Sequence, residues 1–321
     1  MTGPRRLILL ALEHAPLLLL AGVLLAFGAV SPRFLCPQNL VDLLVQSASV
    51  GIVATGMTIV LLSGGIDLSV GALMYVAAAA AGLLLRNAGA PVAIVLPLML
   101  LIGVTFGAVN GLLVAGLRLL PFVVTLATLY AGRGLALWMT QTKAMNLTAY
   151  LSFGAGSVLG VPMPVWMLLG VMAAAHVLLA HTPWGRQLYA LGHDREAARK
   201  AGVATGRVLF ACYVLSGLCA AGGAIVSLTQ LGAVSQKFGL GVEFEAIAAA
   251  ALGGTSLFGG RGKVLPGTLA GAVLLRAIYS GLVMMKASEY AYPLVTSAIV
   301  FLAVLIDVGR TAAMKRLAGA R

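Results

Sequence analysis

Long apolar stretches, separated by short polar connections, run along the whole chain. A helix needs about 20 mostly apolar residues to cross a bilayer core of about 30 Å, and ten segments meet or approach this requirement. These segments are Leu7–Val30, Leu40–Leu62, Leu68–Leu85, Pro91–Leu117, Pro121–Thr140, Met163–His181, Arg207–Leu231, Glu243–Phe258, Val264–Met285 and Tyr290–Asp307. The pattern predicts an all-α polytopic membrane protein, a single transmembrane domain over residues 1–321. About ten transmembrane helices are expected, some of them short or glycine-interrupted.

The connections between these segments differ in charge. Of the 21 Lys and Arg residues, fourteen lie in connections on the side of the two termini, five lie on the opposite side, and two fall inside apolar segments. Cytoplasmic loops of membrane proteins carry an excess of positive charge. We therefore expect the N- and C-termini to be cytoplasmic.

Composition excludes several other classes of protein. Hydrophobic residues make up 61% of the 321 residues and charged residues only 9%, whereas a soluble protein is about one quarter charged. The net charge of +12 lies in short connections, which indicates membrane topology and no nucleic-acid partner. Cys36, Cys212 and Cys219 lack metal-site spacing, and no acid, base and nucleophile converge. We predict no catalytic residue, no metal and no bound cofactor.

One connection on the side of the termini, residues 182–207, is much longer and more charged than the others. Within it, DREAARKAG has the pattern of a short helix with Asp194 as N-cap and Glu196 at the positive end of the helix dipole. Gly202 is suited to a left-handed C-terminal cap. This segment is either an amphipathic helix that stabilises the loop or a helix that docks a cytoplasmic partner.

A second motif, SGGIDLSVG, interrupts a long apolar stretch with Gly64 and Gly65. Asp67 or Ser69 can cap the helix that restarts there. A carboxylate this close to hydrocarbon indicates a functional site, although an N-cap at a tight turn explains Asp67 equally well. GGIDL recurs as GGTSL, with Ser256 in the place of Asp67. Glycine-interrupted segments in two parts of a chain point to a transport pathway, so the second pair, Gly253 and Gly254, is also a hinge candidate.

Four further polar residues lie inside apolar segments. Asn110 either lines a cavity or bonds a neighbouring helix. Thr125, Thr128 and Arg133 belong to PFVVTLATLYAGRG, and the two hydroxyl groups share one helix face. An arginine inside the membrane is expected to face protein or water. These residues are candidates for lining a translocation pathway, and bonding to backbone carbonyls is the alternative for the hydroxyl groups.

At these motifs the chain resembles the permease subunit of bacterial ABC importers for ribose and related monosaccharides. The resemblance covers nearly the whole chain and rests on the order and spacing of four segments. They are GMTIVLLSGGIDLSVGAL, PFVVTLATLYAGRG, TPWGRQLYALGHDREAARKAGV and EAIAAAALGGTSLFGGRGKVLPGTLAGA. Lys200 and Ala201 before the glycine, and Pro266 after GGRGK, depart modestly from the family pattern.

The resemblance implies a multi-pass protein of the bacterial inner membrane that performs no chemistry itself. It implies a second permease protomer, either identical or a close paralogue, and a cytoplasmic ATP-binding subunit that uses ATP and magnesium. A periplasmic sugar-binding protein would deliver the substrate. The family's coupling pattern falls on Glu196, Ala197, Ala198 and Gly202, which would make the charged loop the site of ATPase coupling.

Two other functions remain open on the sequence, and a third fails. A permease for nucleosides or branched-chain amino acids shares the same glycine-rich style. An ion-coupled secondary transporter is disfavoured, because the nine acidic residues lie near predicted helix ends or in the charged loop and form no chain across the membrane. The third, a membrane enzyme, fails for want of a convergent acid, base, nucleophile or metal cluster.

Overall fold

The computed structural model describes residues 14–150, 156–288, 290–292, 294–299, 301–302, 304–305 and 309. Within this part of the chain, seven helices are long and apolar enough to cross a membrane. They are α3 (Pro37–Leu62), α4 (Val70–Asn87), α5 (Val92–Gly111), α6 (Pro121–Thr140), α7 (Met163–His181), α10 (Thr205–Leu231) and α12 (Leu269–Met284). The π-helical turns Leu112–Gly116 and Val264–Thr268 extend α5 and α12. The apolar helix α2 (Ala15–Val30) is shorter, with 16 residues. The structure is an all-α polytopic membrane protein.

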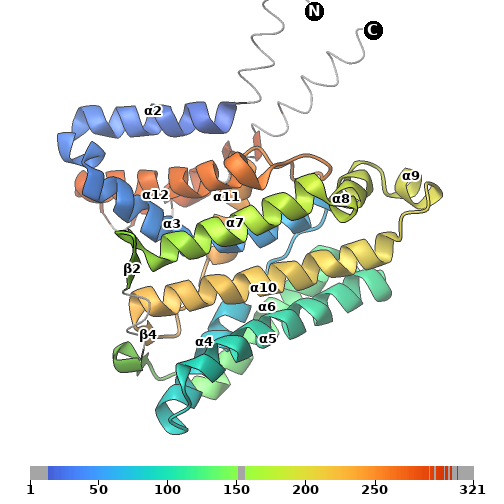
Figure 1. Cartoon of the computed structure of the whole chain (residues 1–321), viewed down its shortest axis with the longest axis horizontal. Helices are drawn as coiled ribbons and strands as arrows, with labels where there is room; N and C mark the ends of the chain where they lie inside the picture. The colour runs from blue at the N-terminus through green and yellow to red at the C-terminus, as the bar shows by residue number, and fades with distance from the viewer. Residues whose placement is uncertain are drawn as a thin grey trace, which may run out of the picture.

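Helices α3 and α10 form the centre of the bundle (Figure 1), and nearly all of the second half of α3 is buried. Small residues allow close packing there. A side chain at Gly217 of α10 would collide with the Gly103 carbonyl of α5, and one at Gly107 would collide with the Tyr213 carbonyl. Ser49 of α3 donates to the Gly223 carbonyl and bonds the Ser227 hydroxyl of α10. Such small-residue contacts are typical of membrane helix pairs, because they let two backbones approach closely.

Short elements lie at the two ends of the bundle. At one end, β1 (Met145–Asn146) pairs antiparallel with β4 (Ala233–Val234), and β2 (Ser157–Val158) pairs antiparallel with β3 (Val161–Pro162). At the other end, α8 (Pro183–His193) and α9 (Arg195–Lys200) project from the bundle (Figure 1). Two 3₁₀ turns, Pro32–Leu35 and Thr148–Tyr150, lie in the connections. We call the end that carries α8 and α9 the α8–α9 end.

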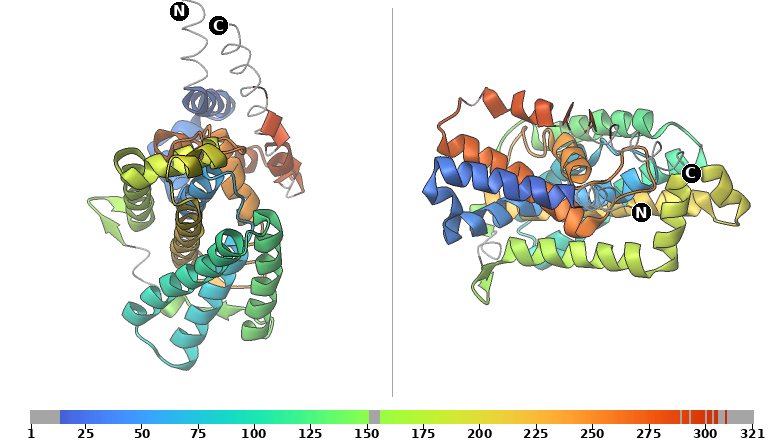
Figure 2. Two further views of the ribbon diagram at one scale, coloured as in Figure 1. Left: turned by 90° about the vertical axis from the view of Figure 1, so that its right-hand side faces the viewer. Right: turned by 90° about the horizontal axis from the view of Figure 1, so that it is seen from above.

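The predicted boundaries agree best with the structure for the helices whose starts are marked by proline. α6 and α7 begin and end at the predicted residues, since Pro121 and the proline-rich Val161–Pro164 stretch mark their starts. The first and last predicted segments are only partly within the described residues. Figure 2 shows the helical residues 294–299, 301–302 and 304–305 in red at the edge of the bundle, next to α12.

The segment expected as a span over Glu243–Phe258 is wrong in length. Its helix α11 (Val242–Leu252) has 11 residues, about 16 Å at 1.5 Å per residue, which is about half of the membrane core. Two glycines at 253 and 254 stop the helix, and the loop that follows reaches the α8–α9 end, where the Gly260 N–H donates to the Leu62 carbonyl over 3.0 Å. The first turn of α11 therefore lies roughly half-way along α3, near the middle of the bundle.

Candidate functional site

The charged loop contains two helices, α8 and α9, and the first of them was not predicted. In α9 the Asp194 carboxylate accepts hydrogen bonds from the Glu196 and Ala197 backbone N–H groups, at 2.8 and 2.9 Å. The N–H groups of Ala197 and Glu196 lower the pKa of Asp194, because they stabilise its charged form. Gly202 has φ +83° and follows the helix end. The predictions of an Asp194 N-cap and a left-handed Gly202 are confirmed.

The four residues predicted for ATPase coupling divide into an inner and an outer face. Ala198 is buried against the bundle, whereas Glu196, Ala197 and Gly202 are exposed. Glu196 pairs with Lys200 one turn later, with 3.1 Å between carboxylate oxygen and Nζ. The outer face of α9 is therefore free of the rest of the described chain. Docking of a partner on this face stays a prediction.

Where α8 rests on the bundle, the end of α3, the end of α8 and the loop after α11 pack backbone against backbone through glycines. A side chain at Gly192 of α8 would collide with the Leu62 carbonyl at the end of α3 and would lie 2.5 Å from the Gly260 nitrogen. Gly259 lies against the Gly192 carbonyl and Gly64. We call Gly64, Gly192, Gly259 and Gly260 the glycine junction. The Tyr189 hydroxyl, which donates to the Gly262 carbonyl over 2.8 Å, reinforces it.

Both glycine-interrupted motifs end a helix in the same way. Gly64 has φ +78°, and the next N–H, of Gly65, bonds back to the Val60 carbonyl. Gly254 has φ +85°, and the next N–H, of Thr255, bonds back to the Ala250 carbonyl. These are Schellman caps, which favour glycine because the left-handed conformation has no room for a Cβ.

The equivalence of the two caps corrects the predicted alignment of the two motifs by one residue. Gly64 corresponds to Gly254, the second glycine of its pair, so that Asp67 corresponds to Leu257. Ser256 is therefore not the counterpart of Asp67. Its backbone N–H donates to the Arg261 carbonyl over 2.8 Å, inside the turn that leads to α12.

Beyond the first cap, Asp67 sits in a buried polar network and is 1% exposed. Its Oδ1 accepts from the Ser69 N–H and hydroxyl, at 3.0 and 2.6 Å, and its Oδ2 accepts from the Ser216 hydroxyl of α10, at 2.8 Å. Asn110 of α5 donates to Ser69 over 2.8 Å. The structure thus unites Asp67, Ser69 and Asn110, which were predicted, with Ser216, which was not. Within the described residues no cation pairs with Asp67.

The two threonines of α6 bond to backbone carbonyls. Thr125 donates to Pro121, at 2.9 Å, and lies 3.3 Å from the Ile66 carbonyl beside the helix break. Thr128 donates to Val124 over 3.1 Å. In the structure these hydroxyl groups therefore bond to backbone carbonyls, which was the alternative to lining a pathway. Their role in a pathway stays a prediction.

Arg133 of α6 reaches the loop that precedes α11. It donates to the Phe238 carbonyl over 2.7 Å and lies over the Tyr75 ring, 5.6 Å from its centroid. Glu243, 5% exposed, lies close enough to interact electrostatically with Arg133. In the described part of the chain, Nη2 of Arg133 and Oε2 of Glu243 have no hydrogen-bond partner. Sequence reasoning missed Glu243, which stands in the first turn of an unexpectedly short helix.

A bundle of membrane helices, two glycine-capped breaks and a charged helix resting on a glycine junction define a polytopic transport protein. Residues 39–308 match the model of a family described as the permease component of the branched-chain amino acid transport system. Relatives support the same assignment, and the chain belongs to this family of transport permeases.

Among these relatives is the ribose import permease protein RbsC of Escherichia coli strain K12. The two proteins are 37% identical over 92% of this chain and 94% of the relative. RbsC of Bacillus subtilis strain 168 is 36% identical over 91% of each protein. The galactofuranose transporter permease protein YtfT of E. coli K12 is 39% identical over 83% of this chain and 78% of the relative. The comparison with solved structures found no match.

Proposed function

We propose that this chain is the membrane-spanning permease subunit of an ATP-driven importer that transfers a monosaccharide across the bacterial inner membrane. The sequence similarity to ribose, allose, galactofuranose and fructose permeases supports the substrate class. In this proposal a cytoplasmic ATP-binding subunit supplies the energy, a periplasmic binding protein delivers the sugar, and a second permease protomer completes the pathway. Ten spans with cytoplasmic termini belong to the same proposal.

The observation that carries the mechanism is the placement of α9. Its outer face is exposed, and the adjoining α8 touches the end of α3 and the turn between α11 and α12 through the glycine junction. A rigid shift of α8 and α9 would therefore move both helix breaks together. Closure of a docked ATPase pair at α9 can in this way be converted into rocking of the membrane helices, which changes the side on which the pathway opens.

The proposal is tested with the complete transporter in proteoliposomes. Permease, its ATP-binding subunit and its binding protein are reconstituted together, and uptake of labelled ribose, allose, galactofuranose and fructose is measured with ATP inside. We expect ATP-dependent uptake of one or more of these sugars and none by the permease alone. Uptake by the permease alone, driven by a proton or sodium gradient, would contradict the proposal.

The family description favours one second candidate, a permease for branched-chain amino acids. Labelled leucine, isoleucine and valine therefore belong in the same uptake panel. ATP-dependent uptake of an amino acid without uptake of any sugar would replace the monosaccharide by this class and leave the importer assignment intact.

A further inference from the structure

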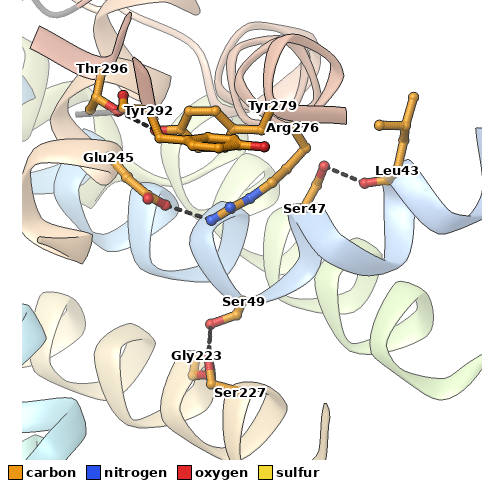
Figure 3. Close-up of polar contacts among 10 residues, drawn as sticks. All are labelled: Leu43, Ser47, Ser49, Gly223, Ser227, Glu245, Arg276, Tyr279, Tyr292 and Thr296. Atoms are coloured by element: carbon orange, nitrogen blue, oxygen red, sulfur yellow. Dashed lines mark hydrogen bonds and ion pairs between the residues drawn. The ribbon is translucent and has the colours of Figure 1, made fainter. Parts of the chain in front are cut away.

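A cavity of about 880 Å³ lies between the first turn of α11, α12 and the helical residues 291–292, 294–299, 301–302 and 304–305. Its walls are largely apolar, with Leu240, Phe244 and Phe301 among them. Ligand sites of proteins have about this size and combine apolar walls with a few polar groups. The polar and aromatic groups here, drawn in Figure 3, are Glu245, Arg276, Tyr279, Tyr292 and Thr296.

These groups come from three elements and point toward one another (Figure 3). Arg276 Nη2 of α12 lies 2.5 Å from Glu245 Oε2 of α11. The guanidinium lies over the Tyr279 ring, 5.3 Å from its centroid. The Tyr279 and Thr296 hydroxyl oxygens are 2.6 Å apart, and the Tyr279 and Tyr292 rings are tilted at 60° with centroids 6.0 Å apart. The cavity thus offers a carboxylate, a guanidinium, hydroxyls and aromatic faces together.

The position of this group favours a transport role over a purely structural one. Arg276 stands near the middle of the Val264–Met284 span, and Glu245 is in the first turn of a helix that covers only half of the membrane. Ionisable residues at this depth are costly and mark substrate pathways. The start of a half-length helix near the midplane is a recurrent place for a transported solute to bind. Each side chain of the pair is still 22% exposed.

We infer that this cavity, here called the α11–α12 cavity, is the site at which the permease holds a monosaccharide during transfer, an inference that rests on the proposed function. A sugar hydroxyl both donates and accepts hydrogen bonds, so neighbouring hydroxyls suit Glu245 as acceptor and Arg276 as donor. The apolar face of the sugar ring suits the faces of Tyr279 and Tyr292.

The ion pair also makes the site weak, as transport requires. Arg276 Nη2 already donates to Glu245 Oε2, so a sugar gains only the difference between its own hydrogen bonds and that bond. A transport site has to bind well enough to admit the solute and weakly enough to release it. Tight recognition is then left to the binding protein.

The inference is tested by saturation-transfer NMR on the permease–ATPase complex in nanodiscs, without binding protein. The probe is ribose, or whichever of the four sugars the wild-type transporter takes up. We expect transfer to the sugar ring protons in the wild type. Glu245→Gln and the charge swap Glu245→Arg with Arg276→Glu should lose it, and their uptake should fall about tenfold or more, as for the loss of one charged hydrogen bond.

The charge swap separates the inference from a structural role of the pair. If the pair only holds α11 to α12, the swap restores both the NMR signal and uptake that Glu245→Gln loses, which would overturn the inference. Ser49→Ala is the matched control, because it removes the interhelical hydrogen bonds to Gly223 and Ser227, which lie outside the cavity, as Figure 3 shows. It should retain the signal.

Three further outcomes decide whether the cavity holds a sugar and whether the proposed function stands. A wild-type transporter that takes up a sugar but shows no saturation transfer from it would exclude a sugar site in the permease and leave the proposed function standing. An acyl chain that co-purifies with the wild type and is lost in Phe301→Trp, with uptake unchanged, would identify the cavity as a lipid site. Absence of sugar uptake by the wild type would instead refute the proposed function.

Discussion

Asp67 and Asp194 make the same local hydrogen bond in opposite surroundings. Each carboxylate accepts the backbone N–H of the residue two positions later, at 3.0 Å for Ser69 and 2.8 Å for Glu196. Asp194 is exposed and caps a six-residue helix in the charged loop. Asp67 is buried at a helix break and also binds Ser216, 149 residues away in the sequence. Capping chemistry alone therefore does not distinguish a surface turn from a site inside the membrane.

The difference lies in what else each carboxylate holds. Removing Asp194 exposes two N–H groups to water, which can replace the lost bonds. Removing Asp67 leaves donors from two elements, Ser69 and Ser216, in a place that water does not reach freely, and unsatisfied buried groups are far more costly. The helix break around Asp67 is thus tied to α10, whereas the turn at Asp194 depends on its own neighbours.

The largest effect is expected at the glycine junction, where these two regions meet. In Gly192→Val the added side chain would collide with the Leu62 carbonyl and the Gly260 nitrogen, so α8 has to leave the end of α3. Such overpacking costs about 3 kcal/mol or more. We expect little folded permease in the membrane, measured by fluorescence size-exclusion chromatography. Normal abundance together with normal transport would show that α8 does not rest on α3.

The next effect compares the two aspartates directly. Asp67→Asn keeps an acceptor for Ser69 but replaces the oxygen that accepts from Ser216 by an amide donor. A charge-assisted hydrogen bond contributes about 1.5–3 kcal/mol, enough to shift a two-state equilibrium about tenfold or more. We expect normal membrane abundance with uptake reduced about tenfold. Asp194→Asn is the control, since asparagine caps as well as aspartate. Equal uptake in both variants would make Asp67 a dispensable cap.

The contrast also separates what the sequence predicts from what it does not. Asp194 and Gly202 act within a few residues, so their capping roles follow from local chemistry, and proline punctuation likewise predicts α6 and α7. The long-range partner of Asp67 is Ser216, 149 residues away, and that of Arg133 is Phe238, 105 residues away. Such contacts depend on how helices pack, which no local pattern encodes.

Two glycines between α9 and the start of α10 provide a test, with a smaller expected effect, of the exposed region around Asp194. Gly202 and Gly206 both have open space where a Cβ would stand, but only Gly202 has a positive φ, +83°. Gly202→Val therefore pays a left-handed strain of about 1–2 kcal/mol, and Gly206→Val does not. We expect Gly202→Val to fold yet to lose stimulation of the ATPase by loaded binding protein, measured in nanodiscs. The same stimulation in both variants would show that the end of α9 plays no part in coupling.

The smallest effect is expected for the exposed pair of Glu196 and Lys200. Its side chains are 68% and 75% exposed, and such pairs one turn apart contribute about 0.5 kcal/mol or less. Lys200→Ala should leave thermal stability and ATPase coupling unchanged. Glu196→Lys should lower stability by only about 1 kcal/mol, because it replaces this pair by two like charges one turn apart and puts a positive charge at the positive end of the helix dipole. If α9 docks the ATPase, however, the reversed charge on its outer face should release the ATPase, as measured by co-purification. If both variants retain the ATPase, α9 is only a surface helix. Of the two regions compared, only the buried one around Asp67 would then act in transport.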